Sequence, residues 1–163
     1  MNLPDISIRT NLLPGDAGLI LYQHGLLYSR EFKYDFKFES YVAGGLQDLL
    51  MHFNPGKDAV WLAFRGQDLT GFISSIHRSD DTAQLRFFFV NEKSRGSGLG
   101  KYLMELWVSN FRSRPYKEAY LWTTREQLAA IALYKKFGFQ LVEEAPSEHL
   151  GKALVEQKYV LTK

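Results

Sequence analysis

A glycine-rich turn, Arg95-Gly96-Ser97-Gly98-Leu99-Gly100, stands between a predicted strand ending at Val90 and a predicted helix over residues 98–111. Glycine adopts positive φ easily and leaves no Cβ in the way of a ligand. Successive backbone N–H groups at a helix N-terminus converge on one point and favour an anion there. Arg95 adds a forked donor that suits phosphate oxygens, and Lys101 adds a point charge. The segment therefore predicts a pyrophosphate-binding turn.

Two familiar phosphate-binding motifs do not fit this turn. A Walker A loop has glycine at the first position and Ser or Thr after the lysine, whereas Arg95 and Tyr102 occupy those positions here. The dinucleotide-binding fingerprint has two residues between its second and third glycines, but only Leu99 separates Gly98 from Gly100. The pattern that remains is Arg-x-x-Gly-x-Gly at a junction of strand and helix.

Composition bounds the class of protein. The 163 residues fit a single domain over 1–163, and 45% hydrophobic with 23% charged residues is ordinary for a globular protein. The formal net charge of +2 comes from scattered Lys and Arg, which argues against a nucleic-acid partner. Residues 1–5 lack the basic and apolar regions of a signal peptide, and no apolar run approaches membrane-spanning length. We therefore expect a cytoplasmic protein with no membrane partner.

Cysteine is absent from the chain. This excludes disulfides, Cys-ligated metals and a catalytic Cys that carries the acyl group. The four histidines lie far apart in the sequence and form no close pair on one predicted helix face, so we expect no metal site; they are His24, His52, His77 and His149.

Hydrophobic spacing predicts strands and helices along the whole chain. The predicted strands cover residues 6–9, 59–64, 69–76, 83–90, 118–123, 139–142 and 153–161. The predicted helices cover residues 15–28, 38–53, 98–111 and 125–137, with an aperiodic segment over residues 29–35. This order indicates the α/β (α+β) class, with a mixed, mostly antiparallel central sheet of about six to seven strands and helices on both faces.

The turn resembles the pyrophosphate loop of the GNAT family of N-acetyltransferases, which reads Arg/Gln-x-x-Gly-x-Gly/Ala after an antiparallel strand. A second block, residues 130–139, matches the family's Ala-x-x-Leu-Tyr-x-x-x-Gly-Phe at a fitting distance, and the element order matches over essentially the whole chain. Residues 28–31, 85–86 and 121–123 are similar to the acetyltransferase domain that follows MarR-type DNA-binding domains in some bacterial regulators. No helix-turn-helix region precedes the domain here, so we expect a free-standing copy.

The resemblance implies an enzyme that uses acetyl-CoA as co-substrate and no metal. An amine of a small molecule, amino acid or peptide would attack the thioester directly in a ternary complex, which agrees with the absence of cysteine. Two alternatives stay open: a transferase that uses another acyl-CoA, and a non-catalytic CoA-binding sensor or interaction module. Because dimers are common in the family, a homodimer is also open.

The resemblance also assigns cofactor-binding residues. The strand before the turn splays away from its neighbour, so that backbone groups of Phe88, Phe89 and Val90 bind the pantetheine arm. The N–H near Phe89 is the candidate oxyanion donor. Gln127 stands where the family often has Asn, which leaves its contact with pantetheine open. The pyrophosphate falls to Arg95, Gly96, Ser97, Gly98, Leu99, Gly100 and Lys101.

Tyr134 is the candidate general acid, because the family's tyrosine at this place lies beside the cofactor sulfur. A phenol with an ordinary pKa of ~10 is able to protonate a departing thiolate. Glu31, in the aperiodic segment, is either the candidate base of the acceptor site or a solvated surface residue. Tyr28 and Tyr34 either line the acceptor pocket or serve in packing. Arg86 is either structural or meets a carboxylate of the acceptor.

Overall fold

The computed structural model describes residues 3 and 5–163, which form seven strands, four α-helices and one short 3-10 helix. The strands are β1 (Ile6–Arg9), β2 (Ala59–Arg65), β3 (Asp68–Ser79), β4 (Thr82–Val90), β5 (Glu118–Thr124), β6 (Gln140–Ser147) and β7 (Leu154–Thr162). The helices are α1 (Asp16–Phe32), α2 (Phe36–His52), η1 (Glu92–Ser94), α3 (Leu99–Ser113) and α4 (Leu128–Lys136). The expectation about residues 1–5 falls partly on residues 1, 2 and 4, which lie outside the described residues.

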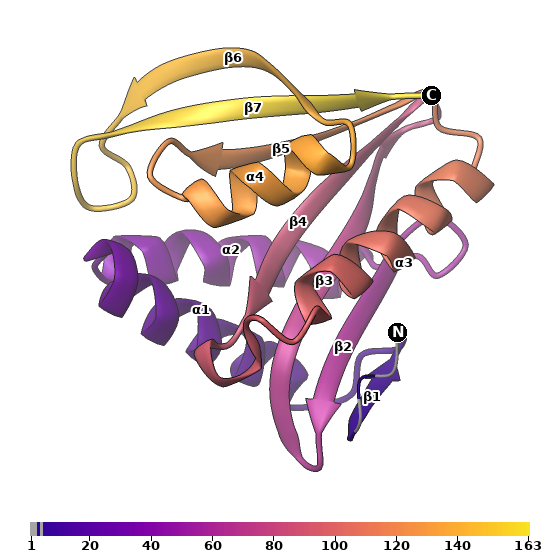
Figure 1. The fold of residues 1–163 in the computed structure, drawn as a ribbon, viewed down its shortest axis with the longest axis horizontal. Coiled ribbons are helices and arrows are strands. Elements are labelled where there is room, and N and C mark those ends of the chain that lie inside the picture. Colours follow the sequence, from indigo (N-terminus) through magenta and orange to yellow (C-terminus); the bar gives the residue numbers. More distant parts are fainter. Residues whose placement is uncertain (1–2, 4) are drawn as a thin grey trace.

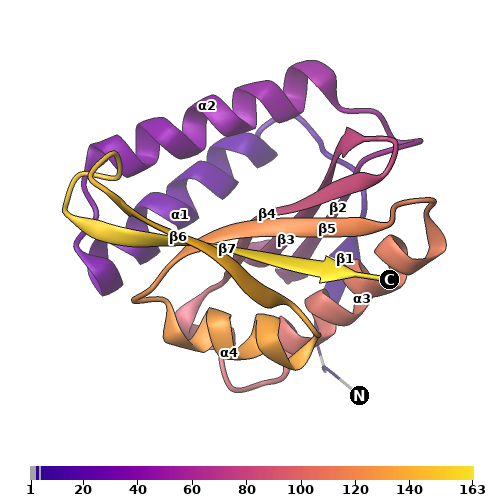
Figure 2. The same ribbon diagram turned by 90° about the horizontal axis from the view of Figure 1, so that it is seen from above.

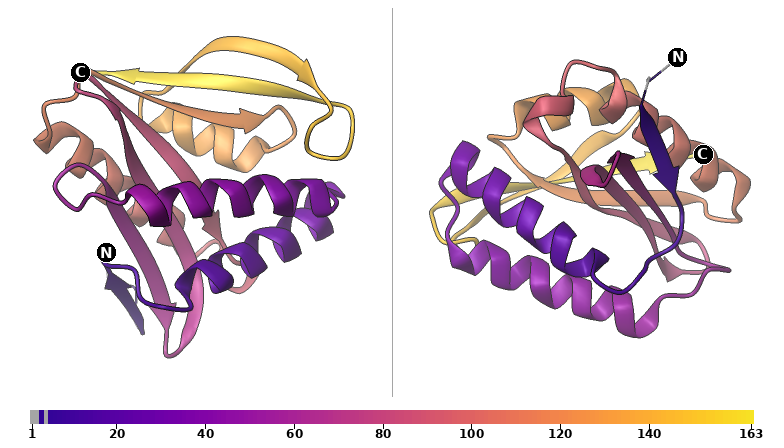
Figure 3. Two further views of the ribbon diagram at one scale, coloured as in Figure 1. Left: turned by 180° about the vertical axis from the view of Figure 1, so that it is seen from behind. Right: turned by 90° about the horizontal axis from the view of Figure 1, so that it is seen from below.

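The strands form one sheet in the order β1-β2-β3-β4-β5-β7-β6. Helices α1 and α2 cover one face, and α3 and α4 cover the other (Figures 1 and 2). Figure 3 shows α1 and α2 lying side by side when the molecule is seen from behind. The predicted class, with a mostly antiparallel sheet between helices, is confirmed.

Strands β4 and β5 form the one parallel pair among the described residues, and they part early. Their pairing covers three positions, from Thr82 opposite Glu118 to Gln84 opposite Tyr120. Beyond that point β4 continues to Val90 beside β3, while β5 turns away (Figure 1). The splay expected from the resemblance is therefore confirmed, and it leaves one edge of β4 without a neighbouring strand.

A bulge in β4 changes which way its side chains point. Arg86 lies opposite Ser74, yet Phe89 lies opposite Phe72, so three steps on β4 match two on β3. Phe87 takes up the extra residue with φ of 58°, an unusual conformation for a bulky side chain. As a result, Arg86 and Phe87 both face α2, whereas a regular strand would place them on opposite faces.

The first helix is longer than the sequence predicts. Of the segment expected to be aperiodic, residues 29–32 instead form the last turn of α1, which ends at Phe32, and residues 33–35 connect it to α2. Lys33 closes the helix in a left-handed conformation, and the N–H groups of Lys33 and Tyr34 donate to carbonyls of the last turn. Helices that end in this way usually have glycine at the left-handed position, so Lys33 did not indicate the end of α1 in the sequence.

Two further boundaries differ from the prediction. Helix α4 begins at Leu128, because the N–H of Gln127 closes a turn on the carbonyl of Thr124 at 3.0 Å. Strand β6 continues past the last apolar alternation to Ser147, paired with β7. It lies at the edge of the sheet, where Pro146 is tolerated.

The core has two parts, one on each face of the sheet. Under α3 and α4, Trp107 is fully buried and its indole Nε1 donates to the carbonyl of Ser74 at 3.0 Å. Under α1 and α2, several aromatic rings enclose His24, which is 3% exposed. Its Nδ1 lies 2.8 Å from the carbonyl of Ile20, and its ring meets Phe89 edge-on with centroids 5.0 Å apart. Burial lowers the pKa of His24 to about 4, so this ring is neutral at pH 7.

The buried His24 predicts a loss of stability in acid. In the unfolded chain its pKa is about 6.5, so between about pH 6.5 and pH 4 the unfolded state binds the additional proton. Stability is therefore fully present above pH 6.5 and falls as pH decreases through this window, by about 3 kcal/mol in total.

Urea unfolding at several pH values measures this effect. The variant His24→Phe is expected to show a flatter dependence on pH, whereas His52→Gln, at an exposed histidine, retains the original slope. A His24→Phe profile parallel to that of the unsubstituted protein would assign the acid sensitivity to other groups.

Candidate active site

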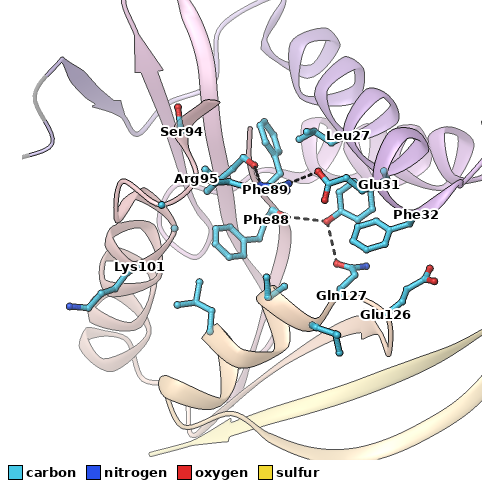
Figure 4. Close-up of a pocket in the computed structure, with 18 of the residues that line it drawn as sticks. Leu27, Glu31, Phe32, Phe88, Phe89, Ser94, Arg95, Lys101, Glu126 and Gln127 are labelled. Atoms are coloured by element: carbon cyan, nitrogen blue, oxygen red, sulfur yellow. Dashed lines mark hydrogen bonds and ion pairs between the residues drawn. The ribbon is translucent and has the colours of Figure 1, made fainter. Parts of the chain in front are cut away.

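A cavity of about 680 Å³ opens where β4 and β5 part. Its walls come from the end of α1, the last residues of β4, the glycine turn and the first half of α4 (Figure 4). The lining is mainly apolar, with charged groups near the turn. Of the residues expected to bind the cofactor, those that line it are Phe88, Phe89, Val90, Arg95, Gly96, Gly98, Gly100, Lys101 and Gln127.

The glycine turn presents backbone donors to this cavity. Gly96 and Gly98 have φ values of 72° and 91°, which explains why glycine is needed at both positions. Ser97 stabilises the turn by donating from Oγ to the carbonyl of Ser94 at 2.6 Å, and Leu99 is buried in the core. Gly98 offers no side-chain cap to α3. Ser97 Oγ accepts only from the N–H of Leu99, at 3.4 Å, so the next N–H groups of the first turn are left for a ligand. The turn therefore has the geometry of an anion site.

Arg95 and Glu31 form an ion pair across this cavity. Arg95 Nη2 lies 2.7 Å from Glu31 Oε1, and its Nε donates to the carbonyl of Val90 at 3.1 Å (Figure 4). The Arg95 side chain is 47% exposed and that of Glu31 is 24% exposed. Glu31 thus belongs to the first cavity, beside the turn. Lys101 pairs with Glu105 at 3.3 Å and points away from this ion pair.

A second, smaller cavity of about 90 Å³ lies beside the first. Tyr28, Phe88 and Gln127 line both cavities and so form the partition between them. The Tyr28 hydroxyl lies 3.5 Å from the carbonyl of Phe88 and 3.4 Å from Gln127 Oε1, which are long hydrogen bonds. Gln127 Nε2 also donates to Thr124 Oγ1 at 3.2 Å. Burial raises the pKa of Tyr28 to about 12, the negative charge of Glu31 adding to this and Arg95 opposing it.

Tyr134 lines the second cavity from α4. It is 5% exposed, and its ring packs near those of Phe88 and Phe139, each centroid 6.1 Å away. Burial raises the pKa of Tyr134 above the ordinary value for a phenol, so its hydroxyl is protonated at neutral pH.

The structure places two of the expected acceptor residues elsewhere. Tyr34 lines neither cavity, because it is buried among aromatic rings with its hydroxyl 2.8 Å from Thr124 Oγ1. Tyr34 thus has the second of the two roles that the sequence left open, because it packs in the core. Glu31 lines the first cavity only, since the residues around it are helical and turn its carboxylate toward Arg95.

The sequence did not indicate several residues that line these cavities. His24, Trp122 and Glu156 line the second cavity beside Arg86, which the sequence did indicate, while Leu128 and Ala129 line the first. Trp122 is 38% exposed, an unusual exposure for a tryptophan in a strand. Its place on a predicted strand was visible, but the parting of β4 and β5 that exposes it was not.

The described residues offer neither a candidate metal site nor a membrane-spanning helix. They contain no group of three or more His, Cys, Asp or Glu side chains placed to hold a metal ion. None of the helices in this part of the chain combines the length and the apolar character needed to cross a membrane.

Comparison with known proteins identifies the family to which this chain belongs. Residues 24–139 match the model of the acetyltransferase (GNAT) family, and this segment includes both cavities' main walls. A curated relative, the mycothiol acetyltransferase of Streptomyces scabiei, is 29% identical over 84 residues, covering 51% of this chain and 27% of that protein. The matches span less than half the length of each of the curated relatives.

Solved structures share the fold over nearly the whole chain. A GNAT-family structure from Desulfovibrio desulfuricans superposes with a TM-score of 0.74 at 20% identity, covering 96% of this chain and 98% of that one. An acetyltransferase from Elizabethkingia anophelis with acetyl-CoA bound has a TM-score of 0.65 at 16% identity, covering 98% and 99%. The likeness to the subgroup fused to MarR-type domains stays a prediction.

Proposed function

Because this chain belongs to the acetyltransferase (GNAT) family, we propose that it transfers the acetyl group of acetyl-CoA to a primary amine in a ternary complex. The observation that carries the proposal is the uncapped N-terminus of α3 with Arg95 beside it, at one end of a cavity that follows the free edge of β4. The structural neighbour with acetyl-CoA bound supports this choice of donor.

The residues of the first cavity fit acetyl-CoA. N–H groups of the glycine turn and the Arg95 guanidinium suit a pyrophosphate. The free edge of β4 offers backbone donors and acceptors to the amides of the pantetheine arm, and the apolar face of α4 packs against its carbon chain. When bound, acetyl-CoA supplies a thioester carbon that accepts an amine.

The oxyanion donor on β4 follows from strand geometry. The N–H of Asn91 donates to the carbonyl of Thr70 on β3, so Phe89, two residues earlier, directs its own N–H to β3 as well. Phe88 and Val90 direct their backbone groups the other way, as the contact of Tyr28 with the Phe88 carbonyl illustrates. The oxyanion role, expected of an N–H near Phe89, therefore falls to the N–H groups of its two neighbours.

Tyr134 supplies the proton that the departing thiolate needs. The amine nitrogen bonds to the acetyl carbon, the carbon–sulfur bond breaks, and the sulfur leaves with the proton of the Tyr134 hydroxyl. The nitrogen loses one proton to solvent as the amide forms, and Tyr134 regains a proton from solvent. The raised pKa keeps that proton on Tyr134 until a thiolate forms. The acceptor amine enters from the second cavity, which Tyr134 lines.

Arg95→Ala tests the proposed binding of acetyl-CoA through its pyrophosphate. Loss of a charge-assisted contact with the pyrophosphate is expected to weaken acetyl-CoA binding by about 10- to 100-fold in calorimetry. Arg112→Ala, at an exposed arginine of α3, is the control and retains the original affinity. An Arg95→Ala protein that binds acetyl-CoA as tightly as the unsubstituted protein contradicts the assignment.

Glu31→Gln distinguishes between two roles for Glu31, the ion-pair partner of Arg95 and the general base. As the partner of Arg95, Glu31 competes with the pyrophosphate, so the variant is expected to bind acetyl-CoA a few-fold more tightly, the scale of an exposed ion pair. Its pH–rate profile is expected to keep its shape. Unchanged affinity for acetyl-CoA, together with loss of the acidic limb of the pH–rate profile, would instead support Glu31 as the general base. Glu143→Gln, at an exposed glutamate, serves as the control.

Tyr134→Phe tests the acid. Turnover is expected to fall by about 100-fold or more, while acetyl-CoA affinity stays within about twofold, because only the proton donor is lost. The exposed Tyr22→Phe provides a matched control. Equal turnover of Tyr134→Phe and the unsubstituted protein, measured by release of the free thiol, would remove the acid role.

A further inference from the structure

Arg86 forms no ion pair within 4 Å with a carboxylate of the described residues. Its guanidinium lies between two aromatic rings, with Cζ 5.5 Å from the centroid of Tyr41 and 4.8 Å from that of Phe87. Its Nε is buried and has no hydrogen-bond partner. The residue as a whole is half-buried, but buried donors such as this Nε are almost always satisfied in proteins. The arrangement therefore calls for an anion that comes from outside the chain.

The surroundings of Arg86 form part of the second cavity. Glu156 also lines this cavity, and its carboxylate lies 3.4 Å from His149 Nε2, which forms an ion pair with it when protonated. Asp48, on the α2 helix that Arg86 faces, pairs with Arg78 at 3.8 Å. The nearby acidic groups thus have other partners, and Arg86 is available to a ligand in the cavity.

Gly45 on α2 makes room for this arginine. A Cβ at this position would lie 2.6 Å from Arg86 Nη2 and 2.9 Å from its Cζ, too close to be accommodated without a shift. Glycine inside a helix is unfavourable, so its presence indicates a local requirement for space. The bulge at Phe87 is the second requirement, because it turns Arg86 and Phe87 to the same face. Two costly backbone features therefore place one unpaired guanidinium at the cavity.

We propose that the acceptor amine also carries a carboxylate, which Arg86 binds, so that the substrate is an amino acid or a similar small molecule. This inference rests on the proposed function and names the substrate class of the same site. The planar fork of a guanidinium matches a carboxylate with two parallel hydrogen bonds. Because Tyr28, Phe88 and Gln127 border both cavities, a ligand anchored on Arg86 lies next to the free edge of β4.

Matched acceptors test the proposal with the full chain at saturating acetyl-CoA. The panel contains free amino acids, the same amino acids with the carboxyl group amidated, and the amines that lack it. Free-thiol release is expected to give a kcat/KM at least tenfold higher for the acids, with the difference mainly in KM. Equal kcat/KM for an acid and its amide would overturn the proposal, as would a clear preference for aminophosphonates over the acids.

Variants connect this preference to Arg86. Arg86→Met is expected to remove the preference for the acid, because kcat/KM falls at least tenfold more for the acid than for its amide. Gly45→Ala keeps the charge but displaces it, and is expected to weaken the same preference. Arg112→Met is the control at a remote arginine and retains the preference. An equal loss of acid and amide activity in Arg86→Met, with an unchanged thermal melt, would contradict the role in carboxylate binding.

A binding measurement separates this proposal from the proposed function. If no amine in the panel releases thiol, the acetyltransferase proposal fails, and the carboxylate site is then tested by calorimetry with N-acetyl amino acids. Binding to the unsubstituted protein that is at least tenfold weaker in Arg86→Met supports the site on its own. Equal affinity of the two proteins, or no binding to either, overturns it.

Discussion

The backbone of β4 loses a neighbour after three residue pairs, and the rest of the site depends on that loss. A strand inside a sheet normally satisfies its polar groups on both edges. Here the edge that faces β5 is free from Leu85 onward, so side chains must supply partners. Tyr28 approaches the carbonyl of Phe88, and Arg95 donates to the carbonyl of Val90. Both residues come from elements on either side of the opening, and both line the larger cavity.

The opening divides into two compartments because β4 is irregular. Phe87, at positive φ, reverses the alternation and brings Arg86 to the face that α1 and α2 cover, while Phe88 stays between the two cavities. The larger compartment has donors for a phosphate at one end and a bare strand edge along its length. The smaller one has aromatic walls and one unpaired cation. Donor and acceptor of a group transfer would thus enter from different sides and meet at Phe88.

Much of this arrangement could be predicted from the sequence, for identifiable reasons. The glycine turn, α3 and the Leu133-Tyr134 block are local patterns. Each can be recognised from neighbouring residues alone, without knowledge of the tertiary structure. The end of α1 was missed because Lys33 takes the left-handed place usually held by glycine, and that error moved Glu31 into a loop. The bulge at Phe87 has no sequence signal at all. The second cavity depends on that bulge and on Gly45, so its lining could be found only from the structure.

Because Arg95 and Glu31 form an ion pair at one end of the larger cavity, an incoming anion must displace the Glu31 carboxylate before it binds Arg95. An incoming anion that offers a single charge replaces one carboxylate with another group of similar strength and gains little. The pyrophosphate proposed for this site would reach both the guanidinium and the first turn of α3, so it would gain contacts that Glu31 does not make. The displaced carboxylate then stands free beside the bound diphosphate and repels any further anion. In this way an acidic residue at an anion site favours a long, doubly anchored ligand over the small phosphates and chloride that are abundant in solution.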